Sequence, residues 1–458
     1  MTSYQSKNPA TGEILETYPA ATDAEVEAAV AAAADAYRSW SSETIERRGE
    51  IVARIGQLFA ERADELAEIA TTEMGKPVAE SKAEAEFSGE IFGYFAQEGP
   101  QLSADQEIKT FSGGRAVIQR LPIGPLLGIM PWNFPYYQVA RFVAPNLMLG
   151  NTVLLKHAES CPRSALAIAS ILQDAGVPEG VYANLFVTHE QSSRIIADPR
   201  IQGVSLTGSE RAGAAVGELA GRHLKKAVLE LGGSDPYIIL DAENVAEAAE
   251  TAWAWRLENT GQACNSNKRM IVHEDIYEPF VHELVARVSA LQPGDPMKGE
   301  PGTYTPLSSR AAGEQLAEQV QDAVSKGATL HTGGELLEEP GSYFAPAVLT
   351  GITPEMRAYH EELFGPVAVV YSVGDDAEAV RLANDSPYGL GGSVFSADEA
   401  RASAVASQLE VGMANVNIPA AEGAELPFGG VKRSGYGREL GPLGMEEFVN
   451  KRLFYIAD

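Results

Sequence analysis

Short apolar segments alternate with helical segments along much of the chain, and this alternation constrains the fold more than any other feature. Residues 153–155, 204–206 and 237–240 are typical of buried strands, and helical patterns at 163–174 and 211–220 lie between them. A strand, a helix and a further strand in this order build a parallel sheet with helices on its faces. The sequence therefore predicts an α/β fold.

A second series of the same kind follows residue 264. Its strand candidates are residues 270–272, 368–373 and 392–395, and its helix candidates are residues 279–291 and 310–326. A chain of 458 residues also exceeds one ordinary domain. We therefore expect at least two α/β domains.

The first part of the chain and its last segment have other patterns. Residues 23–40 and 45–72 predict surface helices, with acidic residues among alanines and leucines. Residues 106–121 alternate in polarity around a Ser112-Gly113-Gly114 turn, which predicts a β-hairpin. Residues 448–456 are typical of an isolated strand that could add to a neighbouring sheet.

The charge balance excludes several classes of partner. Acidic residues outnumber basic ones by 63 to 35, and the net charge of −28 would repel nucleic acids and anionic membranes. No apolar stretch reaches the roughly 20 residues needed to span a bilayer, and residues 1–5 lack the apolar segment of a signal peptide. We expect a soluble, cytoplasmic protein. Its acidity would suit a cell with high internal salt, or it is simply an acidic surface.

The chain has two cysteines, Cys161 and Cys264, too few for a disulfide framework and without the spacing of a metal site. Cys264 follows the polar and small residues 258–263, a setting typical of an accessible nucleophile. A lone cysteine is also compatible with an inert packed side chain. Cys161 has no assignable role.

Three further segments carry groups that suit catalysis. Gly208 stands where a strand passes into a helix, which suits phosphate binding but also an ordinary turn. Glu230 precedes two glycines and could be a general base or a solvated loop residue. Asn133 stands between two prolines, which could fix its amide as a hydrogen-bond donor or simply form a rigid turn.

Taken together, seven ordered motifs resemble those of the aldehyde dehydrogenase superfamily. They are PWNFP at 131–135, LLKHAE at 154–159, TGS at 207–209, LELGG at 229–233, NTGQAC at 259–264, EELFGP at 361–366 and PFGG at 427–430. The resemblance runs from residues 8–12 to the C-terminal segment. Within the superfamily it is strongest to short-form succinate semialdehyde dehydrogenases, including WNFPYYQVARFVAPN at 132–146 and KRSGYGREL at 432–440.

This resemblance implies two doubly wound parallel α/β domains and a small β oligomerisation arm. The implied NAD-binding domain comprises residues 1–103 and 123–231, and the catalytic domain residues 232–426. Residues 104–122 and 427–458 would form the arm and the C-terminal segment. A homodimer or homotetramer is implied, with the hairpin of one subunit pairing with the final strand region of another.

The resemblance also implies the chemistry. The Cys264 thiolate would attack an aldehyde carbonyl, and the Asn133 amide and the Cys264 backbone N–H would hold the oxyanion. After hydride transfer to NAD, Glu230 would activate the water that hydrolyses the thioester. Because Glu230 is present, we expect hydrolysis to a carboxylic acid and no transfer to coenzyme A. A non-catalytic structural or binding member is the alternative, and the three residues argue against it.

The implied cofactor site is formed by Trp132, Lys156, Glu159, Gly208, Ser209, Leu231, Glu362 and Phe364. In this site Glu159 would accept hydrogen bonds from the adenosine ribose. Its charge would oppose a 2′-phosphate by about 1–4 kcal/mol at a separation of ~4 Å. We therefore expect NAD rather than NADP.

The implied aldehyde tunnel is lined by Phe134, Gln138 and Arg141, which share one face of a helix that begins at Pro135. Arg141 could bind the distal carboxylate of succinate semialdehyde, or it could form an interdomain or surface salt bridge. The chain departs from its relatives by placing Glu422 and Glu425 before PFGG. If they face the tunnel, the substrate is an uncharged or cationic aldehyde. If they face solvent, they belong to the acidic surface.

Overall fold

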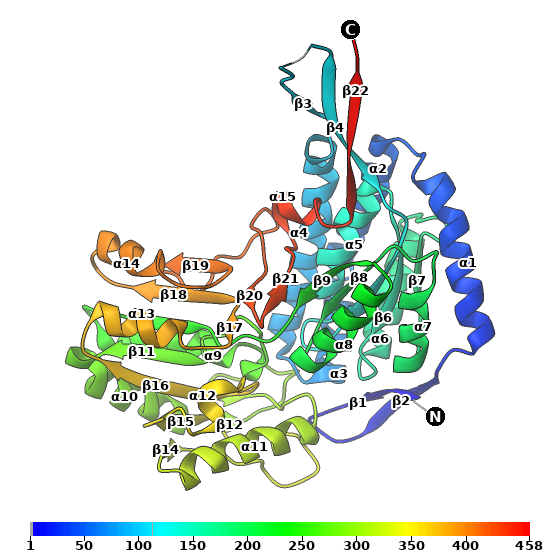
Figure 1. Cartoon of the computed structure of the whole chain (residues 1–458). Coiled ribbons are helices and arrows are strands. Elements are labelled where there is room, and N and C mark those ends of the chain that lie inside the picture. The colour runs from blue at the N-terminus through cyan, green and yellow to red at the C-terminus, as the bar shows by residue number, and fades with distance from the viewer. Residues whose placement is uncertain (1–2, 112) are drawn as a thin grey trace.

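The computed structural model describes residues 3–111 and 113–458, which fold around two mainly parallel sheets with helices on both faces (Figure 1). The first sheet has the strand order β21-β9-β8-β5-β6-β7, and β21 runs antiparallel to β9. Its strands are β5 (Pro125–Met130), β6 (Thr152–His157), β7 (Tyr182–Asn184), β8 (Gly203–Thr207), β9 (Lys226–Glu230) and β21 (Gly435–Tyr436). The expected α/β fold is confirmed.

Side chains that alternate along β6 reach two separate cores. Val153 and Leu155 pack with helices α2, α4, α5 and α6, whereas Leu154 packs with α1, α7 and α8. These helices are α1 (Asp23–Trp40), α2 (Ile45–Glu61), α4 (Val78–Leu102), α5 (Tyr137–Leu149), α6 (Pro162–Asp174), α7 (His189–Ala197) and α8 (Glu210–Arg222). A sheet buried on both faces explains why its strands are continuously apolar.

The helix predicted at residues 23–40 is confirmed as α1, but the single helix predicted at 45–72 is wrong. The chain leaves helical geometry at Arg62 (φ −109°, ψ 17°) and resumes as α3 (Ala63–Met74). The change of direction lets Leu66 and Ala70 of α3 enter the same core as α2. Tertiary packing thus overrides a continuous helical pattern.

The second sheet has the order β14-β15-β16-β11-β10-β18-β19, and its pairs are parallel except at the β14 edge. Helices α9 and α10 cover one face, and α11, α13 and α14 cover the other. The strands are β10 (Pro236–Ile239), β11 (Arg269–His273), β14 (Thr329–Thr332), β15 (Ala347–Thr350), β16 (Val367–Val373), β18 (Gly391–Phe395) and β19 (Met413–Val416). The helices are α9 (Val245–Leu257), α10 (Glu274–Ser289), α11 (Arg310–Ser325), α13 (Asp376–Asn384) and α14 (Glu399–Ala406).

Short elements complete the body of the molecule. They are β1 (Ser3–Lys7), β2 (Ile14–Pro19), η1 (Glu258–Gly261), β12 (Gln292–Pro293), β13 (Thr303–Tyr304), α12 (Arg357–His360), β17 (Tyr388–Gly389), β20 (Val431–Lys432) and α15 (Gly441–Gly444). Strand β1 pairs with β2, β12 with β13, and β17 with β20.

A three-stranded antiparallel sheet projects from the body as an arm (Figure 1). Its order is β22-β4-β3, formed by β3 (Gln106–Ile108), β4 (Arg115–Pro122) and β22 (Val449–Ile456). The predicted hairpin is confirmed, although Ser112 of its turn lies outside the described residues. The predicted pairing of these strands between subunits is wrong, because β22 pairs with β4 of its own chain. Phe448 packs on Phe142 of α5 and so starts β22 at the base of the hairpin.

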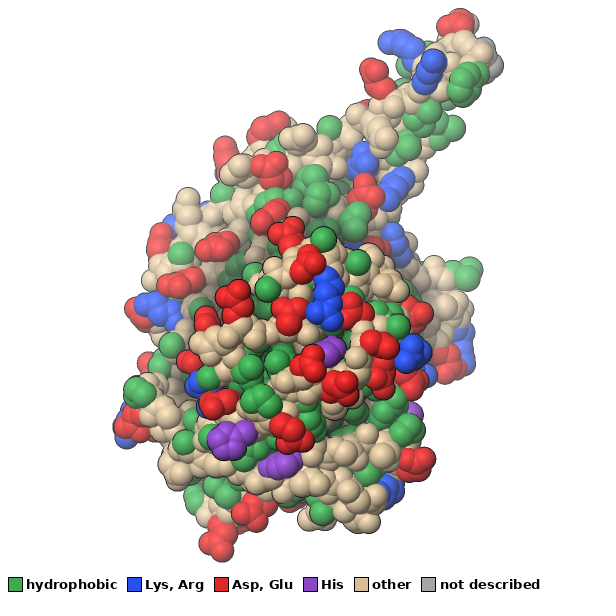
Figure 2. Space-filling view, turned by 90° about the vertical axis from the view of Figure 1, so that its left-hand side faces the viewer, with side chains coloured by type: hydrophobic (Ala, Val, Ile, Leu, Met, Phe, Trp, Pro, Cys, Tyr) green, Lys and Arg blue, Asp and Glu red, His purple; other side chains and the backbone are tan. Residues whose placement is uncertain are grey.

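Acidic side chains are scattered over the face shown in Figure 2, and the arm extends beyond it. In the described part of the chain, no helix combines the length and the apolarity that crossing a membrane requires.

Candidate active site

Cys264 lies where two cavities meet. One cavity of about 560 Å³ is lined by Cys264 together with Trp132, Gly208 and Phe364. The other, of about 190 Å³, is lined by Cys264 together with Arg141. A partly exposed thiol can therefore meet ligands arriving from two sides.

A tight loop before Cys264 fixes its position. Asn259, Thr260 and Gly261 all have positive φ angles, of 46°, 54° and 76°. A side chain at Gly261 would place its Cβ atom 2.3 Å from the Gly365 carbonyl oxygen, so only glycine fits there. Such strain in non-glycine residues is typical of functional loops.

Burial sets the ionisation of the thiol. It raises the pKa of Cys264 to about 12, while the positive charges of Arg141 and Lys268 act in the opposite direction. Glu362 and Glu230 raise this pKa further. Ionisation of this thiol thus depends on the two neighbouring cations.

The Asn133 amide is held in one orientation. Its Nδ2 donates to the Gln262 carbonyl oxygen (2.9 Å), and its Oδ1 accepts from Gln138 Nε2 (3.0 Å). Asn259 Nδ2 also donates to the main-chain oxygen of Asn133 (2.9 Å). Because an amide nitrogen has two N–H groups, one remains for an oxyanion.

Glu230, the last residue of β9, is 2% exposed, and its carboxyl oxygens have no hydrogen-bond partner among the described residues. Burial raises its pKa well above the ordinary value; Glu439 adds to this, and Arg141 and Arg438 oppose it. A raised pKa suits a general base that works near neutral pH. In the described chain Glu230 lines neither cavity that Cys264 lines, so its carboxyl would have to turn toward the thiol.

Arg141 lines a cavity that Cys264 also lines, and it forms the salt bridge that the sequence left open as an alternative. Its guanidinium lines the 190 Å³ cavity, and its Nε lies 2.8 Å from Glu439 Oε2 in a buried ion pair. The rings of Tyr137 and Phe428 lie 4.6 and 4.3 Å from it. Nearby Glu439 helps to raise the pKa of Arg141 against the effect of burial, so the guanidinium stays charged.

The helix carrying Arg141 begins at Tyr137, two residues later than predicted. Phe134 therefore precedes the helix. Phe134, Gln138 and Arg141 nevertheless line the same cavity. Gln138 N donates to the Phe134 carbonyl oxygen (3.2 Å), which holds the PWNFP turn against the start of α5.

Carboxylates line this cavity as well. Glu80, Glu258 and Glu422 line it, whereas exposed Glu425 is not among its lining residues. Burial, followed by Glu422 and Glu80, raises the pKa of Glu258 to about 8. The departure before PFGG thus places one glutamate at the cavity and one outside it.

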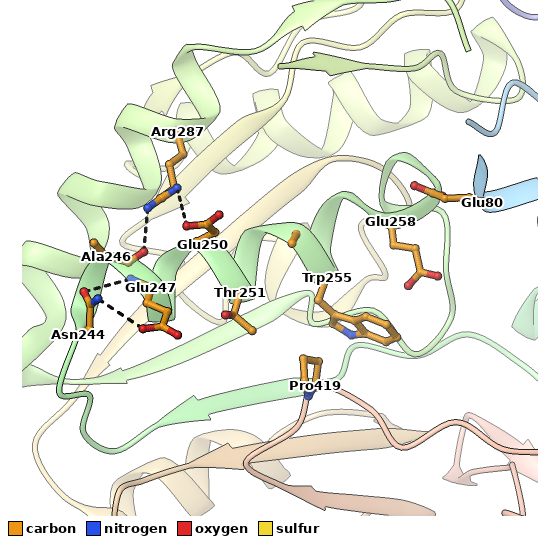
Figure 3. A pocket seen from close by; sticks show the side chains of 11 residues that line it. Glu80, Asn244, Ala246, Glu247, Glu250, Thr251, Trp255, Glu258, Arg287 and Pro419 are labelled. Carbon is orange, nitrogen blue, oxygen red and sulfur yellow. Dashed lines mark hydrogen bonds and ion pairs between the residues drawn. The ribbon is translucent and has the colours of Figure 1, made fainter. Parts of the chain in front are cut away.

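Glu80 and Glu258 also line a groove of about 880 Å³ that does not include Cys264. Figure 3 shows these two glutamates at one end of the groove, and Glu250 and Arg287 at the other. Arg287 Nη1 lies 3.2 Å from Glu250 Oε2. The groove adjoins the outer end of the smaller cavity through the two shared glutamates.

The larger cavity fits a dinucleotide at the N-terminus of α8. Ser209 caps this helix by accepting from Ala212 N (3.3 Å), and the buried Thr207 hydroxyl has no partner among the described residues. Around Gly208 the nearest atom to an added Cβ would be 3.8 Å away, which leaves space beside the helix terminus. Helix N-termini bind phosphate through free N–H groups.

Most of the expected cofactor residues line this cavity. They are Trp132, Gly208, Ser209, Leu231, Glu362 and Phe364. Trp132 and Phe364 pack edge to face at 5.8 Å. Lys156 and Glu159 lie apart from the lining of the cavity in the described structure.

Glu159 is not an isolated charge. Its Oε1 lies 3.6 Å from Lys156 Nζ and 3.7 Å from His189 Nε2. The carboxylate alone would repel a 2′-phosphate. A neighbouring ammonium offsets much of that repulsion.

Three residues of the site had no role assigned from the sequence, although Gln262 and Glu439 lie within the motifs NTGQAC and KRSGYGREL. Gln262 accepts from Asn133, Glu439 pairs with Arg141, and Lys268 bonds to the main chain of Cys264. Lys268 also carried a signal, since it directly precedes the buried strand β11, which begins at Arg269. A charge at such a position needs fixed partners.

Comparison with known proteins identifies the family. The model described as "Aldehyde dehydrogenase family" matches residues 1–453. A succinate-semialdehyde dehydrogenase (NADP(+)) of Deinococcus radiodurans is 53% identical over 451 residues, which are 98% of this chain and 94% of that protein. Its counterpart from Mycobacterium avium is 43% identical over 454 residues, 98% and 96% of the two chains.

Solved structures indicate the same family. The crystal structure of succinic semialdehyde dehydrogenase from Streptococcus pyogenes in complex with NADP+ has a TM-score of 0.96. It is 40% identical and covers 99% of this chain and 100% of that chain.

These names and this complex contradict the expectation of NAD over NADP. Lys156 supplies the physical reason, because an ammonium 3.6 Å from the Glu159 carboxylate offsets the repulsion expected from that carboxylate alone. With a family model covering nearly the whole chain and relatives alike over almost all of its length, this chain belongs to the aldehyde dehydrogenase family.

Proposed function

We propose that this chain oxidises succinate semialdehyde to succinate with NADP. One observation carries the proposal: the Cys264 thiol and the Arg141 guanidinium line the same cavity of about 190 Å³. A small dicarboxylate precursor needs a nucleophile at one end and a cation at the other. The relatives that are 53% and 43% identical carry the name succinate-semialdehyde dehydrogenase.

In this reaction the Cys264 sulfur forms a bond to the aldehyde carbon. The Asn133 amide and the Cys264 N–H donate to the oxyanion. The bound nicotinamide cofactor supplies the acceptor for the hydride that leaves this carbon. Glu230 then takes a proton from the water that attacks the thioester, and the carboxylic acid leaves as the Cys264 sulfur is released.

The cofactor would be held by residues of the larger cavity. Gly208, Ser209 and the first turn of α8 suit the pyrophosphate, and Trp132, Leu231, Glu362 and Phe364 suit the nicotinamide half. Lys156 would offset Glu159 next to the 2′-phosphate. In this assignment residues 1–103 and 123–231 bind the cofactor, and residues 232–426 supply the nucleophile.

A homodimer or homotetramer is also proposed, with residues 104–122 and 427–458 contributing to its interfaces. Apolar side chains on the arm support this. Leu453 is 63% exposed, and Phe111 is 97% exposed. Apolar side chains that cluster on a projecting sheet mark a surface that a partner covers.

The substrate is tested by comparing kcat/KM for succinate semialdehyde and butanal, an uncharged aldehyde of the same chain length. We expect the wild type to prefer the semialdehyde. Arg141→Met should lower kcat/KM for both aldehydes, because the Cys264 thiolate loses a neighbouring cation, but about 100-fold more for the semialdehyde, because a bidentate charged contact is lost only there. Arg141→Met combined with Glu439→Gln serves as the control that leaves no unpaired carboxylate.

An uncharged or cationic aldehyde is the second candidate substrate. It is favoured by Glu80, Glu258 and Glu422 on the cavity and by the pairing of Arg141 with Glu439. The same assay with 4-aminobutanal separates the candidates. Turnover of butanal or 4-aminobutanal equal to or faster than that of the semialdehyde would replace the first proposal with the second.

A further inference from the structure

Lys268 is a fully buried lysine directly behind the nucleophile. Its side chain is 1% exposed. Its Nζ donates to the carbonyl oxygens of Ala263 (2.6 Å) and Cys264 (2.8 Å) and lies 3.0 Å from Glu362 Oε1. An ammonium has three N–H groups, and three acceptors surround this one. Burying a charge is costly unless it is paired and hydrogen-bonded, so these contacts account for its presence.

The contact with Ala263 reaches the oxyanion site. A peptide group is planar and trans, so fixing the Ala263 carbonyl also fixes the direction of the Cys264 N–H. This N–H is one of the two donors assigned to the oxyanion. Lys268 therefore acts on that donor without touching substrate.

The contact with Glu362 reaches the cofactor cavity. Glu362 lines that cavity, and its Oε1 also accepts from Gly233 N (3.1 Å). Gly232 and Gly233 allow Glu362 and the Cys264 main chain to approach them closely. A Cβ at Gly232 would lie 2.4 Å from Glu362 Oε2, and one at Gly233 would lie 2.4 Å from the Cys264 oxygen. With Oε1 engaged by Lys268 and Gly233, Oε2 is the oxygen left to meet a ligand.

We propose that Lys268 is a positioning residue that holds the Ala263–Cys264 peptide and the Glu362 carboxylate as one unit, coupling the oxyanion donor to the cofactor-facing carboxylate. The inference rests on the proposed function, in which Cys264 is the nucleophile and Glu362 contacts the nicotinamide half of the cofactor. It predicts that one substitution at Lys268 alters both catalysis and cofactor binding.

The test compares Lys268→Met, which keeps length and loses the charge, with Lys268→Arg, which keeps the charge. Lys225→Met is the matched control. Lys225 Nζ also donates to two main-chain oxygens, of Asp198 (3.0 Å) and Ile201 (2.5 Å), and it lines neither cavity described above. The Lys225→Met variant measures how much activity and binding change when a lysine that donates to two main-chain carbonyl groups is lost away from the site.

Three quantities are measured: kcat and KM, NADPH affinity by fluorescence titration, and the pH dependence of Cys264 alkylation by iodoacetamide. Lys268→Met should lower kcat about tenfold or more and weaken NADPH binding severalfold. Its alkylation midpoint should rise, because Arg141 alone would then oppose the effects of burial, Glu362 and Glu230 on the thiol. Lys268→Arg should restore the midpoint and part of kcat.

The proposal is overturned if folded Lys268→Met matches Lys225→Met in all three quantities. Should Lys268→Met fail to fold, Lys268→Gln takes its place, because it keeps N–H donors and loses the charge. A Lys268→Gln variant that matches Lys225→Met in kcat, NADPH affinity and alkylation midpoint overturns the proposal. A wild type that does not oxidise succinate semialdehyde would refute the proposed substrate alone. Alkylation and NADPH binding would still test Lys268.

Discussion

The Asn133 amide owes its orientation to two contacts: Gln138 Nε2 donates to its Oδ1 (3.0 Å), and its Nδ2 donates to the Gln262 carbonyl oxygen (2.9 Å). The flanking prolines shape the turn, but they cannot select which face of the amide points toward Cys264. Gln138 and the Gln262 carbonyl oxygen make that selection together, since only the oxygen of Asn133 can accept from Gln138 Nε2 and only its nitrogen can donate to Gln262. A residue expected to bind substrate thus also acts on the oxyanion donor.

Gln138→Met should therefore lower kcat about tenfold with little change in KM, because the freed amide must reorient in each turnover. Steady-state kinetics check this. Asn133→Ala supplies the limiting case, and adding Gln138→Met to it should cause no further loss. A further loss of the same size in the double variant would show that Gln138 acts elsewhere.

A pH dependence is expected from Glu258. Burial, with Glu422 and Glu80, raises its pKa from 4.5 to about 8, so the group is neutral below that pH and negative above it. The KM for succinate semialdehyde should rise as the pH passes through about 8, because the new charge repels the substrate carboxylate. Glu258→Gln should flatten this rise. A rise of equal size for butanal would refute the explanation, since butanal carries no charge.

Among the elements, the arm combines exposed apolar side chains with an open strand edge, two features that isolated proteins avoid. Strand β22 is exposed along nearly all its length, and Leu453, Phe454, Tyr455 and Ile456 are 63%, 46%, 46% and 42% exposed. Pairing with β4 satisfies one edge of β22 but leaves these apolar side chains uncovered.

Leu453→Glu should therefore weaken self-association about tenfold or more, since burying a leucine contributes about 1.5–3 kcal/mol. Sedimentation velocity over a range of protein concentrations measures this. Lys451→Glu on the same strand is the matched control for added charge. A wild type that sediments as a monomer at all concentrations would contradict the prediction.

Most helices and strands could be predicted because the apolar periodicity of the sequence matches the side chains that the fold buries. Helix α1 and strands β8, β11 and β18 lie where the apolar patterns place them. The break at Arg62 could not be predicted, since neither glycine nor proline marks it and the packing of Leu66 decides it. Likewise, no local pattern tells whether β22 pairs within or between chains.

At the scale of the whole molecule, the site forms where the two sheets and their loops meet. Cys264 follows α9 of one unit, whereas Asn133 and Glu230 follow β5 and end β9 of the other. The sequence motifs identified these three residues by resemblance. They could not supply the pairing of Arg141 with Glu439 or of Glu159 with Lys156, because those contacts depend on tertiary distance. The prediction of NAD over NADP was wrong because it rested on Glu159 without its Lys156 partner.

The net charge of −28 predicts that salt stabilises the molecule. Molar potassium chloride should raise the melting temperature, because the Debye length falls to about 3 Å and mutual repulsion between carboxylates is screened. Differential scanning calorimetry in low and molar salt measures it, with sucrose as the uncharged control. An unchanged or lower melting temperature in salt would show that surface repulsion does not limit stability.

Cys264 is proposed to form an acyl-enzyme, which Glu230 helps water to hydrolyse. The most direct measurement mixes Glu230→Gln with succinate semialdehyde and NADP and follows NADPH and intact mass together. We expect a burst of about one NADPH per subunit and a succinyl group retained on Cys264, because hydrolysis lacks its base. Cys264→Ser should give neither signal. Continuous turnover by Glu230→Gln at the wild-type rate, or NADPH formation without an adduct on Cys264, would contradict the account.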